Sequence, residues 1–399
     1  MKALQGLLLA LLLLGLSAAV GFYAARALER SRVTTELPLE APPLEEEVTA
    51  RRAVVEPVGA PVPRSSRSDA GELVHGRWAA VNKQAIAALD QGELERAVEL
   101  FEACHAALPG EDVFRRNFAE ALVRLAVRDH ERIRPCKECL GRLERALELT
   151  PGREDLAFLI EHWRRESEAE KDFWRESSLH FDLAYDGSRD ELLFGSGSIL
   201  GELESAYTDL VDVFGRAFVD EGRPRISVVL YRRESFDALT GLGDWAGGAF
   251  DGTVRVPVED LAQEATKLAR VLRHELVHAF VRETGGAAVP GWLNEGLAQW
   301  LEGEPRASVA AAREELEGRE LFALETLQGS LATWKDAEQI ALAYAQSLVF
   351  CDYIARNYGE NVLLRMVEGC QQAAPPAQTF EDLTRVPLDA VLGDLGDEL

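Results

Sequence analysis

The pattern of apolar and polar positions divides the chain into four stretches. Residues Ala3–Ala25 carry no charge and are long enough to cross a bilayer as a helix. Residues 33–75 are rich in Pro, Glu, Arg and Ser and show no apolar period, which is typical of a disordered linker. Residues 76–170 and 171–399 show the periodic patterns of folded segments. We therefore expect an N-terminal signal sequence or anchor over 1–32, a linker over 33–75 and two folded parts.

The first folded part, residues 76–170, has the spacing of paired amphipathic helices. It resembles tetratricopeptide repeats, which have 34 residues and fixed small, aromatic, small and proline positions. Two sets of residues follow that spacing: Ala97, Phe101, Cys104 and Pro109, and then Cys139, Leu143, Ala146 and Pro151. The prolines are 42 positions apart, and we place the extra residues in RDHERIRP; Val81 stands where the repeat usually has tryptophan. The resemblance implies an all-α module that could bind a protein partner.

The second folded part, residues 171–399, begins with strand patterns. SLHFDLAYDG and PRISVVLYRR are rich in alternating or β-branched residues, and the amphipathic stretch GSILGELESAYTDLVDVFG between them predicts a helix. WAGGAFDGTVRVPV predicts one further strand with glycine-rich turns at its start, and the remaining residues are mostly helical. The expected fold class is α+β, with a small sheet followed by a helical C-terminal part.

Composition narrows the function only slightly. The chain has 399 residues, 47% of them hydrophobic and 28% charged, as in an ordinary folded protein. Its net charge of −25 argues against the basic surface that nucleic-acid binding requires. We therefore expect no nucleic-acid partner.

The apolar N-terminal stretch has two interpretations. A cleaved secretory signal would have a shorter apolar core and a small-residue cleavage site, and SAAV and YAAR are imperfect candidates. An uncleaved membrane anchor fits the length, with Tyr23 near the interface and Arg26, Arg30 and Arg32 beyond it. We favour the anchor. Either interpretation predicts a membrane-anchored or secreted protein with its main body outside the cytoplasm, periplasmic or extracellular.

The chain has five cysteines, an odd number that indicates no disulfide framework. Cys136 and Cys139 form a CxxC pattern that can be a redox or zinc pair. No second CxxC accompanies it in the sequence, and Cys139 occupies a small-residue position of the repeat. We therefore interpret it as a packing residue, and a local disulfide remains an alternative.

The sequence HELVH, residues 274–278, suggests the chemistry of the second part. In a helix, His274 and His278 lie on the same face and can aim at one point, with Glu275 at its edge. This arrangement suits a zinc hydrolase, which needs neutral nitrogen ligands and a carboxylate beside the metal-activated water. Taken alone, the HELVH motif could also have arisen by chance, without any metal site. Glu295 in WLNEGLAQW, 17 residues after His278, is the candidate third ligand, and its neighbour Asn294 is a candidate helix cap or ligand-orienting residue.

HELVH followed by WLNEGLA resembles the gluzincin zinc metallopeptidases of the peptidase MA group, from about His180 to the C-terminus. The resemblance implies a zincin-like domain in which His274, His278 and Glu295 hold one Zn²⁺ ion and Glu275 is the general base. It also makes Tyr344 the candidate donor to the oxyanion, although an ordinary packed tyrosine is an equal alternative.

Two further features carry alternatives. Gly247 and Gly248 could let a substrate backbone approach an edge strand, or could be simple turn glycines. Gln299 stands four residues after Glu295, where some relatives have an acidic partner for a histidine. This departure leaves the groups that orient the ligands undetermined.

These features predict an exported or membrane-tethered zinc metallopeptidase that acts on a peptide or protein substrate. One alternative is a catalytically silent peptidase-like and repeat scaffold that binds a protein partner. Another keeps the zinc but changes the scissile bond, for instance to a cell-wall peptide. The intact HExxH and Glu295 favour the active enzyme.

Overall fold

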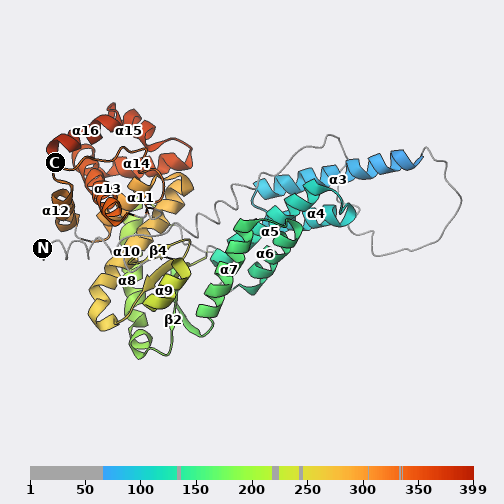
Figure 1. Ribbon diagram of the computed structural model, residues 1–399, viewed down its shortest axis with the longest axis horizontal. Coiled ribbons are helices and arrows are strands. Elements are labelled where there is room, and N and C mark those ends of the chain that lie inside the picture. Colours follow the sequence, from blue (N-terminus) through green and yellow to red (C-terminus); the bar gives the residue numbers. More distant parts are fainter. Residues whose placement is uncertain are drawn as a thin grey trace. The chain divides into compact units, whose positions relative to one another are not determined.

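The computed structural model describes residues 66–132, 136–217, 224–241, 246–303, 305–331, 334 and 336–399. Within these residues the chain divides into two compact units (Figure 1). We call them the helical unit, which ends at Trp163, and the sheet unit, Arg164–Leu399.

The helical unit consists of paired helices. Ala97, Phe101, Cys139 and Leu143, four of the predicted repeat positions, have no exposed surface and lie in its apolar core. Part of the predicted insertion lengthens the third helix, which runs on to Arg132. The paired helical region is therefore confirmed, whereas its tetratricopeptide nature stays a prediction. The helices are α3 (Ser66–Asp90), α4 (Leu94–Ala107), α5 (Asp112–Arg132), α6 (Lys137–Leu149) and α7 (Glu154–Ala169). The end of α7, from Arg164 on, belongs to the sheet unit.

Cys136 and Cys139 form a disulfide at the start of α6. Cys139 is fully buried in the core of the helical unit, as expected of a packing residue, and Cys136 is 8% exposed. Cys139 is therefore both a packing residue of the core and a partner in the local disulfide. The three other cysteines of the chain, Cys104, Cys351 and Cys370, are buried free thiols.

The sheet unit contains a five-stranded sheet in the order β1-β2-β3-β5-β4. The strands β2, β3 and β5 are parallel, and antiparallel pairs close the sheet at β1 and β4. The predicted helix, α8 (Asp190–Phe214), is the crossover that a parallel β2–β3 pair requires. The strands are β1 (Phe173–Ser177), β2 (Phe181–Asp186), β3 (Ile226–Tyr231), β4 (Ala249–Phe250) and β5 (Val254–Pro257).

The two predicted strands around α8 are confirmed, and two details of the sheet were not predicted. WAGGAFDGTVRVPV forms a hairpin of two strands, β4 and β5, rather than one strand. Its turn is made by Gly252, with φ at 107°, and by Asp251, whose Oδ1 accepts a hydrogen bond from Thr253 N at 3.1 Å. The edge strand β1 was missed because its sequence, FWRES, is mostly polar and half exposed.

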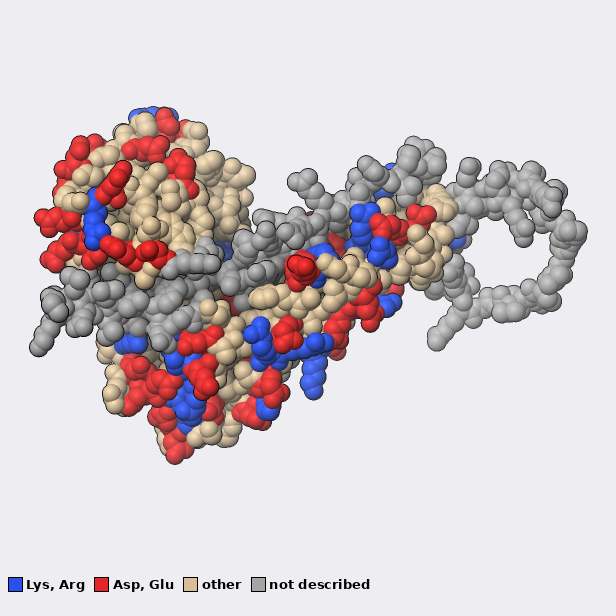
Figure 2. Space-filling view, in the orientation of Figure 1, with Lys and Arg blue, Asp and Glu red and all other residues tan. Residues whose placement is uncertain are grey.

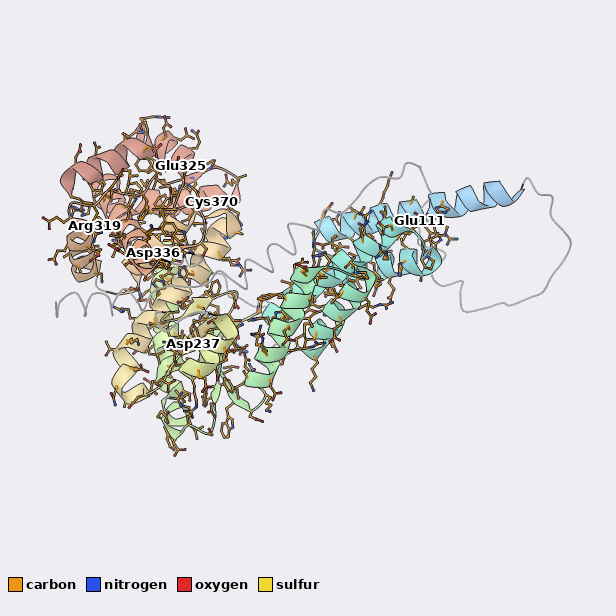
Figure 3. The ribbon with its side chains drawn as sticks, in the orientation of Figure 1. Glu111, Asp237, Arg319, Glu325, Asp336 and Cys370 are labelled. Atoms are coloured by element: carbon orange, nitrogen blue, oxygen red, sulfur yellow. A yellow bond between two sulfur atoms is a disulfide. The ribbon has the colours of Figure 1, made fainter. Side chains whose placement is uncertain are left out.

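Helices form most of the rest of the sheet unit, as predicted, and the α+β class is confirmed. The main apolar core lies between one face of the sheet and α8, α10, α11 and α13, and a smaller cluster that includes α9 covers the other face. Asp336 caps α13, and Cys370 lies on α14 (Figure 3). The helices are α9 (Arg233–Thr240), α10 (Leu261–Gly285), the 3₁₀ turn η2 (Gly286–Ala288), α11 (Gly291–Leu301), α12 (Pro305–Leu316), α13 (Ala337–Tyr358), α14 (Glu360–Gln371), α15 (Pro376–Thr384) and α16 (Leu388–Glu398).

The predicted signal or anchor over 1–32 and most of the predicted linker lie outside the described residues. Helix α3 begins at Ser66, so residues 66–75, which we had assigned to the linker, are helical. No helix among the described residues is long and apolar enough to cross a membrane. On the face shown in Figure 2, basic and acidic side chains are interspersed along both units.

Candidate metal centre

Helix α10 carries HELVH into the core of the sheet unit. Asp260 begins the helix by accepting hydrogen bonds from the backbone N–H groups of Ala262 and Gln263. The second half of the helix is buried on nearly every side, so His274 and His278 are 1% and 2% exposed. Ionisable side chains in such surroundings need partners, because burying an unpaired charge is costly.

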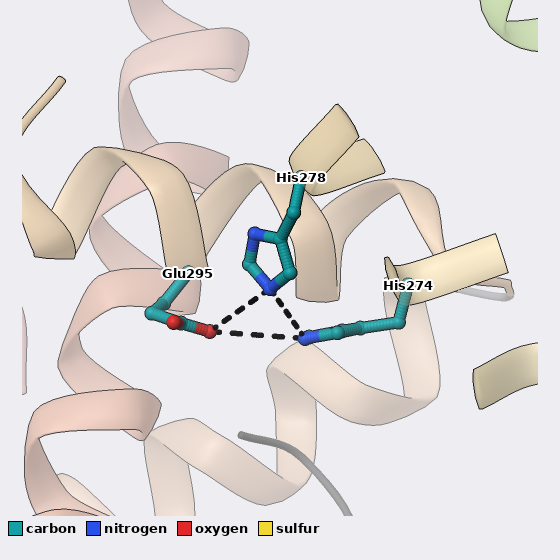
Figure 4. A group of neighbouring side chains, drawn as sticks. All are labelled: His274, His278 and Glu295. Carbon is teal, nitrogen blue, oxygen red and sulfur yellow. Dashed lines mark hydrogen bonds and ion pairs between the residues drawn. The ribbon is translucent and has the colours of Figure 1, made fainter. Parts of the chain in front are cut away.

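The two histidines and Glu295 converge on one point (Figure 4). The Nε2 atoms of His274 and His278 are 3.2 Å apart. Oε2 of Glu295 lies 3.5 Å from Nε2 of His278 and 3.7 Å from Nε2 of His274. Zinc bound tetrahedrally at about 2.0–2.2 Å needs ligand atoms roughly 3.3–3.6 Å apart. The three side chains thus have the donor types and the spacing of a zinc site.

Helix α11 brings Glu295 to this point, in its second turn. The backbone N–H groups of Gly291 and Trp292 donate to the carbonyls of Gln328 and Leu327 at 2.9 and 3.0 Å, which anchors the start of the helix. A Cβ atom at Gly296 would lie 2.4 Å from the carbonyl oxygen of Ser347. Glycine there lets α11 approach α13 closely.

Each histidine is oriented through its other ring nitrogen. Nδ1 of His278 lies 3.0 Å from Oδ1 of Asn294, and Nδ1 of His274 lies 2.8 Å from Oε2 of the buried Glu302. Both acceptors favour the tautomer that presents Nε2 to the centre. Of the two roles expected for Asn294, the contact matches the orienting one.

Sequence reasoning missed Glu302. It stands seven positions after Glu295, two helical turns along the same face, and that spacing was the available signal. Gln299, one turn after Glu295, turns elsewhere: its Nε2 donates to the carbonyl oxygens of Glu295 and Tyr344 at 3.1 and 3.0 Å. The acidic partner is therefore present, one turn later than expected.

The two glutamates beside the histidines have opposite pKa shifts. Burial raises the pKa of Glu275 to about 8; Glu295 and Glu302 add to the rise, and His274 opposes it. Burial would also raise the pKa of Glu295, but His278 and His274 outweigh it and hold that pKa below its usual value. The electrostatics thus favour a carboxylate at Glu295 and a proton-carrying group at Glu275.

The pKa values of the two histidines are also shifted in opposite directions. Burial by itself lowers the pKa of His274, yet its contacts with Glu295 and Glu302 bring the pKa to about 10. Burial lowers the pKa of His278.

Two buried carboxylate oxygens that lack hydrogen-bond partners in the described part of the chain also fit a bound cation. Oε2 of Glu295 and Oε2 of Glu275 are buried and have no hydrogen-bond partner among the described residues. Two unsatisfied carboxylate oxygens beside two imidazoles would be costly, and a divalent ion with its water would satisfy both.

The carboxylate of Glu275 rests against Gly248, which directly precedes β4. A Cβ atom at Gly248 would lie 2.7 Å from Oε1 of Glu275. The missing side chain of Gly248 therefore makes room for Glu275, a reason for glycine that differs from both expected ones, which stay predictions.

Tyr344 reaches the cluster from α13. Its hydroxyl is buried and makes no hydrogen bond of ordinary geometry to the described residues, yet it lies close enough to Glu295 to lower the pKa of that carboxyl. Burial, together with Glu295 and Glu275, raises the pKa of Tyr344 well above its usual value. The hydroxyl therefore keeps its proton and can donate it in a hydrogen bond.

A small α+β unit with an HExxH helix and a glutamate on the next helix has the features of a metallopeptidase-like domain. In agreement, residues 224–384 match the family model of the Peptidase MA superfamily. The match runs from just before β3 to the end of α15 and includes α10, α11 and α13. The match supports a peptidase MA-like domain over this segment. No curated protein matches the chain.

Proposed function

We propose that the protein is a zinc-dependent metallopeptidase that hydrolyses peptide bonds. The observation that carries the proposal is the convergence of His274, His278 and Glu295 on one point (Figure 4). Glu275 is buried close enough to His274 and Glu295 for both to affect its pKa. His274, His278 and Glu295 would hold the ion. Bound there, Zn²⁺ would supply Lewis-acid polarisation and an acidified water molecule.

Glu275 is the general base of the proposed reaction. Its unpartnered Oε2 accepts a proton from the attacking water and then delivers it to the leaving amine. Without a metal, burial raises the pKa of Glu275 to about 8. A bound divalent cation would favour the ionised form of Glu275, so that the carboxylate could take and return a proton near neutral pH.

Tyr344 is proposed to donate to the oxyanion that forms at the scissile carbonyl. Preorganised donors stabilise the developing charge without reorganising during the reaction. The hydroxyl suits this role because it is buried, holds its proton and faces the same cluster.

Strand β4 is the proposed docking edge for the substrate. It ends the sheet and lies beside α10, so an extended peptide could pair with it as one more strand. Peptides are proposed as substrates on this basis, without restriction to a particular sequence.

The other parts of the chain place the enzyme in a proposed context. The apolar stretch Ala3–Ala25 supports export or membrane tethering, with the main body outside the cytoplasm. The helical unit is proposed to bind a protein partner or to present a substrate.

The test is zinc analysis of the fragment 66–399, paired with cleavage of a peptide library that includes cell-wall peptides. The wild type and Glu275→Gln should both bind one zinc ion, and only the wild type should cleave. Glu325→Gln, a change of the exposed glutamate labelled in Figure 3, is the matched control and should cleave normally.

Zinc in both proteins with cleavage in neither would refute the enzyme and favour the silent scaffold. Absence of zinc from the wild type would refute the metal site itself.

A further inference from the structure

Strand β5 carries a buried arginine outside the metal centre. Val254 and Val256 point into the main core, whereas Arg255, between them, faces the opposite side of the sheet and is 2% exposed. A guanidinium cannot lose its charge at ordinary pH, so its burial requires negative partners.

The acceptors around Arg255 come from three separate elements, and those on two of them are carboxylates. Arg255 donates through Nη2 to Glu166 on α7 and through Nη1 to the hydroxyl of Tyr231 on β3, the latter at 2.7 Å. The Tyr231 hydroxyl in turn donates to Glu170 at 2.5 Å. Nε of Arg255 donates to Oδ2 of Asp251, in the β4–β5 turn, at 3.1 Å. We call these five residues the Arg255 cluster.

The hairpin joins the Arg255 cluster to the metal centre. Ala249 on β4 pairs with Arg255 on β5, and the next residue but one, Asp251, holds the guanidinium. The residue before Ala249 is Gly248, whose backbone lies against the carboxylate of Glu275. The short segment Gly248–Asp251 thus contacts Glu275 at one end and Arg255 at the other.

A buried ion cluster is weak evidence that the fold is more stable with it, because apolar side chains of similar volume often stabilise a protein to the same extent. What such a cluster does provide is a fixed geometry, since a planar guanidinium fixes several acceptors at once. In this unit the fixed acceptors belong to α7, to β3 and to the hairpin that touches the general base.

We propose that Arg255 is a positioning residue: through Asp251 it fixes the β4–β5 hairpin to the end of α7, and the hairpin holds Glu275 in its working position. This inference rests on the proposed function, and it adds residues far from the metal ligands in sequence. Loosening the Arg255 cluster should therefore lower turnover without removing zinc.

The test compares Asp251→Asn with the wild type in the full chain. Asparagine keeps the size of the side chain and an acceptor for Thr253 N, but it loses the charge that holds Arg255. Two readouts are measured well below the thermal midpoint: kcat and KM per zinc-loaded molecule, and amide hydrogen exchange over residues 248–256. Glu204→Gln, which breaks the His180–Glu204 pair elsewhere in the sheet unit, is the matched control.

For Asp251→Asn we expect unchanged zinc content, a KM close to that of the wild type, faster exchange in the hairpin and a kcat lowered by about 10- to 100-fold, the usual cost of a misplaced group. Glu166→Gln, which attacks the Arg255 cluster from α7, should shift both readouts the same way, and Glu204→Gln should shift neither.

A kcat per zinc-loaded molecule equal to the wild-type value, or unchanged exchange in the hairpin, would overturn the inference. If the wild type binds zinc but cleaves nothing, the proposed function fails; the exchange comparison then still decides whether Arg255 fixes the hairpin.

Discussion

At the scale of single residues, two glutamates of the same buried site have opposite surroundings. Glu295 faces two imidazoles, whereas Glu275 faces Gly248 and other carboxylates. The same side chain is therefore kept ionised at one position and holds its proton to about pH 8 at the other. Such pairs commonly separate an ion-binding role from an acid–base role.

The contact of Gly248 with Glu275 gives a first prediction. Gly248→Ala should retain zinc but lose most of its cleavage, because the new Cβ would lie 2.7 Å from Oε1 of Glu275 and must displace it. The measurement is kcat per bound zinc. Gly201→Ala on α8 is the control, because its new Cβ would meet no described atom within 4 Å apart from its chain neighbours and the nearby backbone of its own helix. Full turnover by the Gly248 variant would mean that Glu275 does not need its present position.

The pKa of His274 predicts how zinc binding depends on pH. At about 10, this pKa means that the metal-free protein carries a proton on His274 at pH 7. Zinc requires the neutral ring, so binding should release at least one proton, and affinity should fall about tenfold per pH unit for each proton as pH drops. Calorimetry at pH 7 in buffers of different ionisation enthalpy measures this release.

Glu302→Gln tests the cause of that release. Removing the carboxylate 2.8 Å from Nδ1 of His274 should lower the pKa of His274 and reduce the number of protons released. It should also weaken zinc binding by about 10- to 100-fold, as is usual for groups that orient a ligand. Equal proton release and affinity in both proteins would contradict the assigned role of Glu302.

At the scale of elements, the position of Glu295 depends on how closely α11 packs on α13. Gly296→Ala should destabilise the sheet unit by about 1–3 kcal/mol, because the new Cβ would lie 2.4 Å from the carbonyl oxygen of Ser347. Displacement of α11 should also reduce zinc content. Both effects can be followed by thermal denaturation and metal analysis.

Gly393→Ala on α16 is the matched helical control, since its new Cβ would meet no described atom within 4 Å apart from its chain neighbours and the nearby backbone of its own helix. It should stabilise the unit by up to about 1 kcal/mol through the better helix propensity of alanine. A Gly296 variant with wild-type stability and full zinc content would show that the α11–α13 contact does not position Glu295.

At the scale of the whole molecule, the two compact units should respond to different treatments. Zinc at about 100 times its dissociation constant should stabilise only the sheet unit, by about 2.7 kcal/mol. Reduction of the Cys136–Cys139 disulfide should destabilise only the helical unit, by about 2 kcal/mol, because the closed loop is short. Differential scanning calorimetry with zinc, with chelator and with reductant should separate the two transitions. A single transition shifted by both treatments would contradict this division.

Local patterns in the sequence were sufficient for the α+β class, the paired helices, the strands around α8 and the pairing of His274 with His278. Each depends on residues close together in the chain, where helical and strand periods determine which side chains share a face. The hairpin of β4 and β5 was predicted as one strand. Its turn depends on the positive φ of Gly252, and glycine adopts positive or negative φ according to its surroundings, so the sequence alone did not reveal the turn.

The sequence by itself therefore determined most of the helices and strands. It also identified His274, His278 and Glu295, which we assign to the metal, and Glu275, which we assign as the general base. Tertiary structure decided what surrounds them: Glu302 rather than Gln299 beside His274, Gly248 beneath Glu275, and Arg255 fixed to α7. These contacts join segments far apart in the chain. Their geometry depends on how α10, α11 and the hairpin pack together, which no local period specifies.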